Sequence, residues 1–413
     1  MTSASKIAAG SKLVTNQSAS WQPFTEVNRV DPYPMYSRLR ELDPVHQTNA
    51  GNWVITGYAE VCAVFTDKRF EVLNMPDYFR LKTLNNNGVT HSFESIYNAT
   101  HRWLFYTTRP THTYLRELIM QVWPTLDFTG CVSGVLADTK RTLEATPQPD
   151  LNLHLAKRVP ALIMTRLLGF PENQATNLQY WGEQLASIFE PMLTRPQLLE
   201  INASAQQIMA LIEQTVADHK AHPRPTLIGR LVQQAQQSQI TVDHLELLSL
   251  INNLFVAGGE TTRNLIGNGC YLLAQYPEQR DQLRRDPGLL KTAVDEILRF
   301  ESPVQLTARV ATENVVLAGR QIRAGQELYL CQGAANRDEK QFDQADIFDI
   351  SRQKNKHLAF GYGTHFCLGS QLARMQAIAT FQLLHRRLLC APYLYAGRNA
   401  FTTARPLAQL PLR

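Results

Sequence analysis

The clearest pattern in the chain is a long series of apolar residues at helical spacing. Leu245, Leu248 and Ile251 begin the series, which continues for about thirty positions. We expect one helix that starts at Thr241, as its N-cap, and ends near Pro277. At 1.5 Å per residue it would be roughly 50 Å long, and its apolar middle is typical of a helix that crosses a core.

Helical patterns dominate the rest of the chain, with a few short strand patterns. Helices are expected over much of 114–274, at 58–66, at 289–300 and after residue 367, whereas 73–108 is irregular. Strand patterns occur at 52–56 and, as strand, turn and strand, at 315–330; a terminal hairpin is possible at 393–412. The sequence therefore predicts a mainly α fold with small β-sheets (α+β).

The first twenty residues are polar and contain no apolar run that could serve as a signal peptide or a membrane anchor. No break in composition divides the rest of the chain. We expect a flexible tail over residues 1–20 and a single domain over 21–413, in a cytoplasmic monomer without a membrane anchor.

Charge and cysteine content exclude several classes of protein. The chain has 41 Lys and Arg against 36 Asp and Glu, which is too small an excess to indicate a nucleic-acid partner. Its six cysteines are scattered without a Cys-x-x-Cys pair, which argues against a zinc site and a disulfide framework and fits a reducing compartment.

One cysteine stands in an unusual setting. Residues 360–369 read Phe-Gly-Tyr-Gly-Thr-His-Phe-Cys-Leu-Gly, and a helical pattern begins directly after them. The glycines let backbone N–H groups approach the sulfur of Cys367, and a helix N-terminus stabilises a thiolate. Such a thiolate suits a haem iron. Taken alone, Cys367 could equally be a buried structural cysteine.

The complete string resembles the haem loop of the cytochrome P-450 family, the haem-thiolate monooxygenases. The resemblance implies the cytochrome P-450 fold, with the long central helix over haem b and the cysteine loop beneath it. It makes Cys367 the axial ligand of the iron and places Phe360, Gly361 and Gly369 against the haem.

The middle of the long helix carries a second string, Ala-Gly-Gly-Glu-Thr-Thr, at 257–262. Two glycines there cost about 1 kcal/mol each relative to alanine, and a buried acid costs more. A close helix crossing would explain the glycines but not the acid–alcohol pair. The string is similar to the family segment over the distal face of the haem. The resemblance implies that Ala257 and Gly258 contact the haem at a local opening, that Thr261 hydrogen-bonds dioxygen, and that Glu260 relays protons.

Glu296 and Arg299 share one helix face, which for most such pairs means a solvated surface pair. Here the spacing resembles the Glu-x-x-Arg pair that the family buries behind the haem loop. Arg352 resembles the third member of that network.

Four residues resemble the family's contacts to the two haem propionates: His112, Arg116, Arg309 and His365. His112 and Arg116 stand four apart and would project from one helix face. Residues 108–111 read Thr-Arg-Pro-Thr, where bacterial relatives usually read Asp-Pro-Pro-Glu. The effect of Arg109 in place of the usual proline cannot be read from the sequence.

The resemblance implies a bacterial monooxygenase that inserts one oxygen atom from dioxygen into a mid-sized lipophilic substrate, by hydroxylation or epoxidation. Electrons would come from NAD(P)H through a separate ferredoxin or flavodoxin with its reductase. Candidates for a docking face are Lys354, Lys356, Arg102, Arg109 and Arg374, although each taken singly is more simply a solvated cation.

The substrate pocket is expected to draw on the 73–108 segment, on 189–199 and on a set of mostly apolar residues. A terpenoid, polyketide, macrolide, steroid or fatty acid would fit, and the sequence does not separate them. The residues expected to line the pocket are Val256, Ala257, Val304, Gln305, Leu306, Pro406 and Leu407.

The sequence leaves three other functions open: a peroxide-using or coupling haem-thiolate enzyme, a non-catalytic haem-binding sensor or carrier, and a helical binding module without haem. The Glu260–Thr261 pair favours dioxygen activation over peroxide use, because a peroxide user needs no proton relay.

Overall fold

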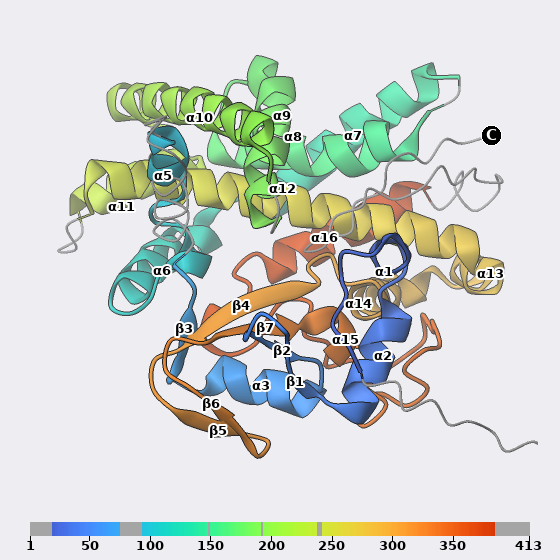
Figure 1. Ribbon diagram of the computed structural model, residues 1–413. Helices are drawn as coiled ribbons and strands as arrows, with labels where there is room; N and C mark the ends of the chain where they lie inside the picture. The colour runs from blue at the N-terminus through green and yellow to red at the C-terminus, as the bar shows by residue number, and fades with distance from the viewer. Residues whose placement is uncertain (1–18, 75–92, 148, 191–192, 238–241, 385–413) are drawn as a thin grey trace, which may run out of the picture.

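The structure is a computed structural model that describes residues 19–74, 93–147, 149–190, 193–237 and 242–384 (Figure 1). The predicted tail up to residue 18, the possible terminal hairpin, Pro406 and Leu407 lie outside the described residues. None of the described helices is long and apolar enough to cross a membrane.

Helices make up most of the described chain, as the sequence predicts. The α-helices are α1 (Glu26–Val30), α2 (Tyr33–Leu42), α3 (Tyr58–Thr66), α5 (Glu94–Thr100), α6 (Thr111–Val122), α7 (Phe128–Ala145), α8 (Arg158–Leu168), α9 (Ala175–Ala186), α10 (Arg195–Ala221), α11 (Leu227–Gln237), α12 (His244–Gln275), α13 (Pro277–Arg285), α14 (Leu290–Phe300), α15 (Gln332–Ala335) and α16 (Ser370–Leu384).

Short turns of other helix types join these elements. A π-helical segment, η3 (Asn152–Lys157), leads into α8. The 3-10 turns are η1 (Leu104–Tyr106), η2 (Trp123–Thr125), η4 (Glu172–Gln174), η5 (Ser187–Phe189), η6 (Pro287–Leu289) and η7 (Gly363–His365). Together, α5 and η1 correct the expectation that 73–108 is irregular throughout.

The predicted long helix is α12, which crosses the middle of the molecule (Figure 1). Its N-cap is Asp243 and not Thr241, which lies outside the described residues. The Asp243 carboxylate accepts from the backbone N–H of Glu246, and Glu246 reaches back to the N–H of Asp243, so the two form a capping box. This reciprocal pair satisfies two helix-end donors and fixes where α12 begins.

A five-stranded sheet lies on the other side of α12 from α7–α10 (Figure 1). Its order is β1-β2-β7-β4-β3, antiparallel except for the parallel pair β2–β7. The strands are β1 (Val45–Gln47), β2 (Trp53–Ile55), β3 (Phe70–Val72), β4 (Leu306–Ala311) and β7 (Glu327–Cys331), and β5 (Val315–Leu317) and β6 (Arg320–Ile322) form a separate hairpin.

The expected strand, turn and strand at 315–330 was therefore only partly right. β5 and β6 pair with each other, but β7 joins the larger sheet and pairs with β4. Within that sheet Arg309 on β4 lies between Leu328 and Val72 on the neighbouring strands. Arg309 and its neighbours on β4 therefore lie where the sheet meets the space beneath α12.

Two hydrophobic cores flank this space. The larger is built around α12 and packs α5–α10, α14 and α16 together, whereas the smaller lies between the sheet and α3. A fold with a helical core on one side and a sheet core on the other leaves room for a site between them.

Candidate active site

A cavity of about 1840 Å³ opens between α12, β4 and the loop that carries Cys367. It brings together residues that lie far apart in the sequence, from the start of α6 to the start of α16. Among its lining residues are His112, Arg116, Ala257, Gly258, Glu260, Thr261, Arg309, Phe360, Gly361, His365, Cys367 and Gly369. Every predicted haem-contact residue therefore lines one space.

Cys367 lies three residues before α16, at the end of a tight loop. Gly361 and Gly363 adopt left-handed φ angles of 70° and 72°, which glycine tolerates best. The backbone N–H of Cys367 donates to the Phe360 carbonyl at 2.9 Å. Burial raises the pKa of the Cys367 thiol, while a backbone hydrogen bond from Gly369 and the cations Arg116 and Arg374 act in the opposite direction.

Two cations and two histidines gather at one edge of the cavity. His112 and Arg309 are only 5% and 7% exposed, and the His112 and His365 rings lie 4.1 Å apart between centroids. The Arg309 guanidinium lies over the Phe65 ring. Among the residues that the structure describes, neither Arg116 nor Arg309 forms an ion pair.

Burial and the neighbouring cations keep these histidines neutral. Burial lowers the pKa of His112 to about 4, with Arg116 and Arg109 adding to the effect. Burial also lowers the pKa of His365 to about 3, with His112 and Arg309 contributing. Burial lowers even the pKa of Arg309, to about 10. The edge is therefore a buried, positively charged cradle that suits an anion.

These observations fit an iron porphyrin. The Cys367 thiol lines this cavity, and a metal ion bound there would convert it to a thiolate. One edge of the cavity holds two guanidinium groups that have no ion-pair partner among the described residues, beside the two neutral histidines, which can donate hydrogen bonds. Carboxylates such as the two haem propionates are the anions that such an edge suits. Gly369 adds to the fit, because a Cβ built there would meet no atom within 4 Å.

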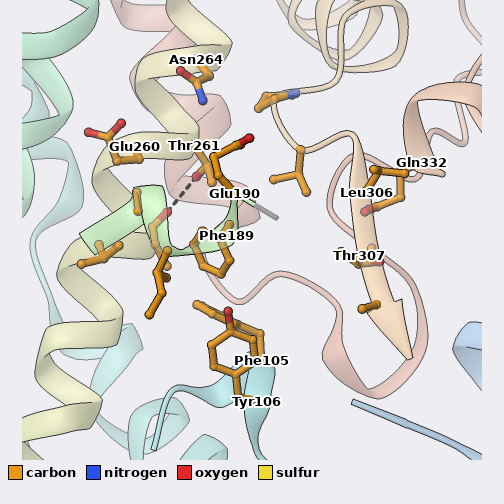
Figure 2. A pocket seen from close by; sticks show the side chains of 18 of the residues that line it. Phe105, Tyr106, Phe189, Glu190, Glu260, Thr261, Asn264, Leu306, Thr307 and Gln332 are labelled. Atoms are coloured by element: carbon orange, nitrogen blue, oxygen red, sulfur yellow. Dashed lines mark hydrogen bonds between the residues drawn. The ribbon is translucent and has the colours of Figure 1, made fainter. Parts of the chain in front are cut away.

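Thr261 and Glu260 lie on α12, which forms part of the cavity wall (Figure 2). The Thr261 hydroxyl donates to the Ala257 carbonyl at 2.7 Å. The Glu260 carboxylate accepts from Arg263 at 3.0 Å, and Arg263 also pairs with Glu183 at 3.1 Å. Burial raises the pKa of Glu260, although Arg263 opposes this. Glu260, Arg263, Glu183 and Lys157 thus form a chain of charged groups, and all four line the cavity.

The helix around these residues is continuous, and no interruption of α12 marks the local opening that the resemblance implies. A Cβ at Gly258 would come within 2.6 Å of the Met164 sulfur on α8, whereas one at Gly259 would meet nothing within 4 Å. Gly258 therefore also serves a close helix crossing, the alternative explanation for this glycine.

Glu296 and Arg299 form a completely buried ion pair, with two N···O distances of 2.8 Å. Arg299 also donates to the carbonyls of Asn336, Ala345 and Ile347. Arg352 donates to Glu296 at 3.1 Å. The structure thus brings the three predicted members of this network together, and Asn355 and the Asp349 backbone complete the shell around Glu296.

The predicted substrate-pocket residues divide into three groups. Val256, Ala257, Val304 and Leu306 line the cavity. Gln305 does not: it is 1% exposed and turned away, with its amide donating to the Ser302 carbonyl at 2.8 Å and its oxygen beside Gly333. Gln305 directly precedes β4, and its contacts with Ser302 and with Gly333 of α15 hold its side chain away from the cavity. Leu407 lies outside the described residues.

The cavity has an aromatic wall in the two segments that the sequence assigned to the pocket, 73–108 and 189–199, and several polar groups that the sequence did not single out (Figure 2). The wall comprises Phe105 and Tyr106 of η1, with Phe189 of η5 packed on them. The run Trp-Leu-Phe-Tyr at 103–106 was a signal inside a segment expected to be irregular. The polar residues Glu190, Asn264, Thr307 and Gln332, also on the cavity, gave no such signal.

Two of the five cations suggested for a docking face are already paired. Arg102 donates to Glu246 at 2.7 Å, and Arg374 donates to Asp295 at 2.7 Å. Arg109, Lys354 and Lys356 are exposed. Of the five, these three fit an open basic surface.

Comparisons with known proteins agree with this arrangement. The family model described as Cytochrome P450 matches residues 179–388. The chain is 33% identical to the biotin biosynthesis cytochrome P450 of Bacillus subtilis, covering 92% of this chain and 96% of that one. It is 32% identical to the mycinamicin IV hydroxylase/epoxidase of Micromonospora griseorubida, covering 89% and 90%.

A solved structure shares the fold. The crystal structure of P450BioI in complex with an acyl carrier protein carrying hexadec-9Z-enoic acid superposes with a TM-score of 0.84. The two chains are 30% identical, and the match covers 94% of this chain and 99% of that one.

Proposed function

The chain belongs to the cytochrome P450 family and is a haem-dependent monooxygenase, and from this premise we propose that it hydroxylates or epoxidises a mid-sized, largely apolar natural product. When bound, haem b supplies dioxygen activation and the oxidising power to attack an unactivated C–H or C=C bond. The residues of this chain hold and orient that group, move protons and bind the substrate.

Cys367 would hold the iron from one side. Its loop presents the sulfur to the cavity beside the Gly369 amide, and Arg116 and Arg374 favour the ionised form. Arg116, Arg309, His112 and His365 would bind the propionates and so fix the orientation of the ring. Both histidines are neutral near pH 7 and would each donate one N–H.

Thr261 and Glu260 would manage protons on the other side. The Thr261 hydroxyl is held by the Ala257 carbonyl, so a rotation about χ1 would free it to donate into the cavity. Burial raises the pKa of Glu260, which lets this carboxyl carry a proton at a pH where an exposed one would not. The Arg263–Glu183–Lys157 chain would extend this proton path along the cavity wall.

The substrate class is supported by the cavity wall and by the relatives. Phe105, Phe189, Val256, Val304 and Leu306 present apolar side chains, which suits a lipophilic molecule. Relatives are named for polyketide biosynthesis, macrolide oxidation and biotin biosynthesis, and one neighbour was solved with a fatty acid on its acyl carrier protein. We propose a substrate of this polyketide, macrolide or fatty-acyl type.

Electrons would reach the enzyme from NAD(P)H through a separate ferredoxin or flavodoxin with its reductase. Lys354 and Lys356 are exposed cations shortly before the Cys367 loop, and Arg109 is exposed three residues before His112, which suits the docking of an acidic redox protein.

The observation that carries the proposal is the single cavity that is lined by both Cys367 and Thr261. The test is turnover by the haem-loaded enzyme with a surrogate ferredoxin, its reductase, NADPH and a panel of macrolides, terpenoids, steroids and fatty acids. A mono-oxygenated product with one atom from ¹⁸O₂ supports the proposal. Haem incorporation without an oxidised product from any class would favour the sensor or carrier alternative, and turnover with peroxide alone would favour the peroxide-using alternative.

A further inference from the structure

Tyr106 carries a hydroxyl group that has no hydrogen-bond partner among the described residues. The oxygen is buried in the cavity wall, and in Figure 2 it points towards the Phe189 ring. A buried hydroxyl without a partner is unfavourable, because it has given up its hydrogen bonds to water. Burial raises the pKa of Tyr106 well above its usual value, so the hydroxyl keeps its proton and acts as a donor.

The surroundings of this hydroxyl are aromatic. The Tyr106 ring stacks on Trp103 at 6.1 Å with an interplanar angle of 7°, and Phe105 and Phe189 pack against its other sides at 4.9 and 6.1 Å. None of these side chains offers a strong acceptor. Among the described residues, no acceptor completes this group, and the cavity that Tyr106 lines is where a bound molecule can supply one.

The backbone beneath this wall is held to α12 by buried polar side chains. Ser249 accepts from the Arg102 N–H at 2.9 Å and donates to the Ala99 carbonyl at 3.1 Å. Asn253 accepts from the Leu104 N–H at 3.1 Å, and Asn252 donates to the Ala99 carbonyl at 3.0 Å. We call Ser249, Asn252 and Asn253 the α12 clamp.

The α12 clamp occupies positions that a helix through a core would normally give to apolar residues. Ser249, Asn252 and Asn253 are at most 2% exposed. Their hydrogen bonds all go to the segment 99–104, directly before Tyr106. Arg102 adds an ion pair to Glu246, the residue that closes the α12 capping box. This fixed backbone gives the Tyr106 ring a defined position, as a specificity-determining donor requires.

We propose that Tyr106 is a substrate-orienting hydrogen-bond donor and that the α12 clamp positions it. The inference rests on the proposed function and narrows its substrate class: the preferred molecule is lipophilic but carries a neutral acceptor oxygen, such as a ketone, lactone or ester, on the side that meets Tyr106. Phe189 shields the hydroxyl until that oxygen replaces it.

The test compares two probes of equal size, cyclododecanone and cyclododecane, that differ only in the acceptor oxygen. Binding to the haem-loaded enzyme is followed by the shift of the haem absorption as water leaves the iron. The wild type should bind the ketone more tightly than the alkane, and Tyr106→Phe should lower this preference about five- to tenfold, because one neutral hydrogen bond is lost. Alkane binding should change much less than ketone binding, since the alkane has no acceptor oxygen. Tyr97→Phe, which removes a hydroxyl from α5 outside the cavity lining, is the matched control.

A second pair of variants tests the α12 clamp. Ser249 does not line the cavity, so it acts only through the segment that it holds. Ser249→Ala should lower the ketone preference, and Ser249→Thr should restore it by keeping the hydroxyl. In the Tyr106→Phe background, Ser249→Ala should have no further effect on the preference. A purely structural role for Ser249 would instead lower binding of both probes in either background.

Four outcomes would count against the inference. An unchanged preference in Tyr106→Phe, or an equal loss for both probes, would overturn it. If Tyr106→Phe changed the haem content or the reduction potential but not the preference for the ketone, the hydroxyl would be a partner of a haem propionate, and the inference would also be overturned. A wild type that binds neither probe and oxidises no lipophilic compound would instead overturn the proposed function, and the inference with it.

Discussion

Two buried charged regions lie close to the candidate haem site and are completed in opposite ways. The Glu296–Arg299–Arg352 network is closed: the carboxylate and both guanidinium groups find partners within the chain at 2.7–3.3 Å. The Arg116–Arg309 edge of the cavity is open, because no described carboxylate pairs with either guanidinium. Since a buried charge must be compensated, the closed network indicates a structural role and the open one indicates a ligand.

The largest expected effect comes from opening the closed network. Arg299→Ala would leave the Glu296 carboxylate buried without its main partner and should lower the free energy of unfolding by about 3–5 kcal/mol. Urea unfolding followed by circular dichroism measures this. Arg374→Ala, which breaks a partly exposed pair with Asp295, is the matched control and should lose about 1 kcal/mol or less. Equal losses would remove the distinction between a buried and a surface network.

The same unfolding measurement on a variant of the open edge should show no loss of stability in the apoprotein. Arg309→Met removes a buried cation that the apoprotein does not compensate, so the apoprotein should become no less stable. Haem affinity should nevertheless fall roughly ten- to a hundredfold, the worth of one hydrogen bond to a charged group. The rate of haem transfer to a scavenging apoprotein measures this loss. An apoprotein destabilised as strongly as Arg299→Ala would show that Arg309 is a structural residue.

A third prediction concerns the part of the cavity wall that α12 forms. Thr261→Ala removes the hydroxyl that would serve dioxygen, so product formed per NADPH consumed should fall about tenfold or more. Thr261→Ser keeps the hydroxyl and should retain most of the coupling. Unchanged coupling in Thr261→Ala would exclude this residue from oxygen activation.

The smallest effect is a pH dependence from Glu260. Burial raises the pKa of this carboxyl, so the folded chain retains a proton that the unfolded chain has released. The resulting stability is complete below the ordinary carboxyl pKa and is lost as the pH rises through the raised pKa of the folded chain. The loss amounts to about 1.4 kcal/mol for each pH unit that separates the two pKa values. Glu260→Gln should lack this loss.

Comparing the unfolding free energies of wild type and Glu260→Gln between acidic and mildly alkaline pH isolates the contribution of this carboxyl. Glu172→Gln is the matched control on an exposed carboxylate. Parallel curves for wild type and Glu260→Gln would mean that Arg263 fully offsets the burial of Glu260.

The sequence predicted those parts of the molecule that depend on local patterns. The bounds of α3 and α14 and the extent of α12 result from apolar periodicity, and the Cys367 loop results from its glycines. The start of α12 was placed at Thr241 because two good cap residues compete there, and of the two Asp243 has a glutamate at the reciprocal position.

Features that depend on contacts distant in sequence could not be predicted in the same way. Apolar and polar residues hardly alternate along β4, so its own sequence does not mark it as a strand. Its place in the sheet is decided by partners distant in sequence: Phe70 of β3, for example, pairs with Ala311 of β4. Gln305 was assigned to the pocket with its neighbours Val304 and Leu306, but its side chain is held elsewhere by contacts with Ser302 and Gly333 that the sequence pattern does not reveal. Tyr106 lies in the 73–108 segment that was assigned to the pocket, but it was not singled out, because its role depends on the α12 clamp, which holds its segment from about 150 positions away.

The central claim is that the Cys367 sulfur binds the haem iron in this cavity, and the absorption spectrum of the reduced, carbon monoxide-bound protein tests it most directly. The account predicts the strongly red-shifted haem band of a thiolate-ligated iron in the wild type and its loss in Cys367→His. A wild-type spectrum typical of imidazole ligation, or a protein that takes up no haem, would contradict the account.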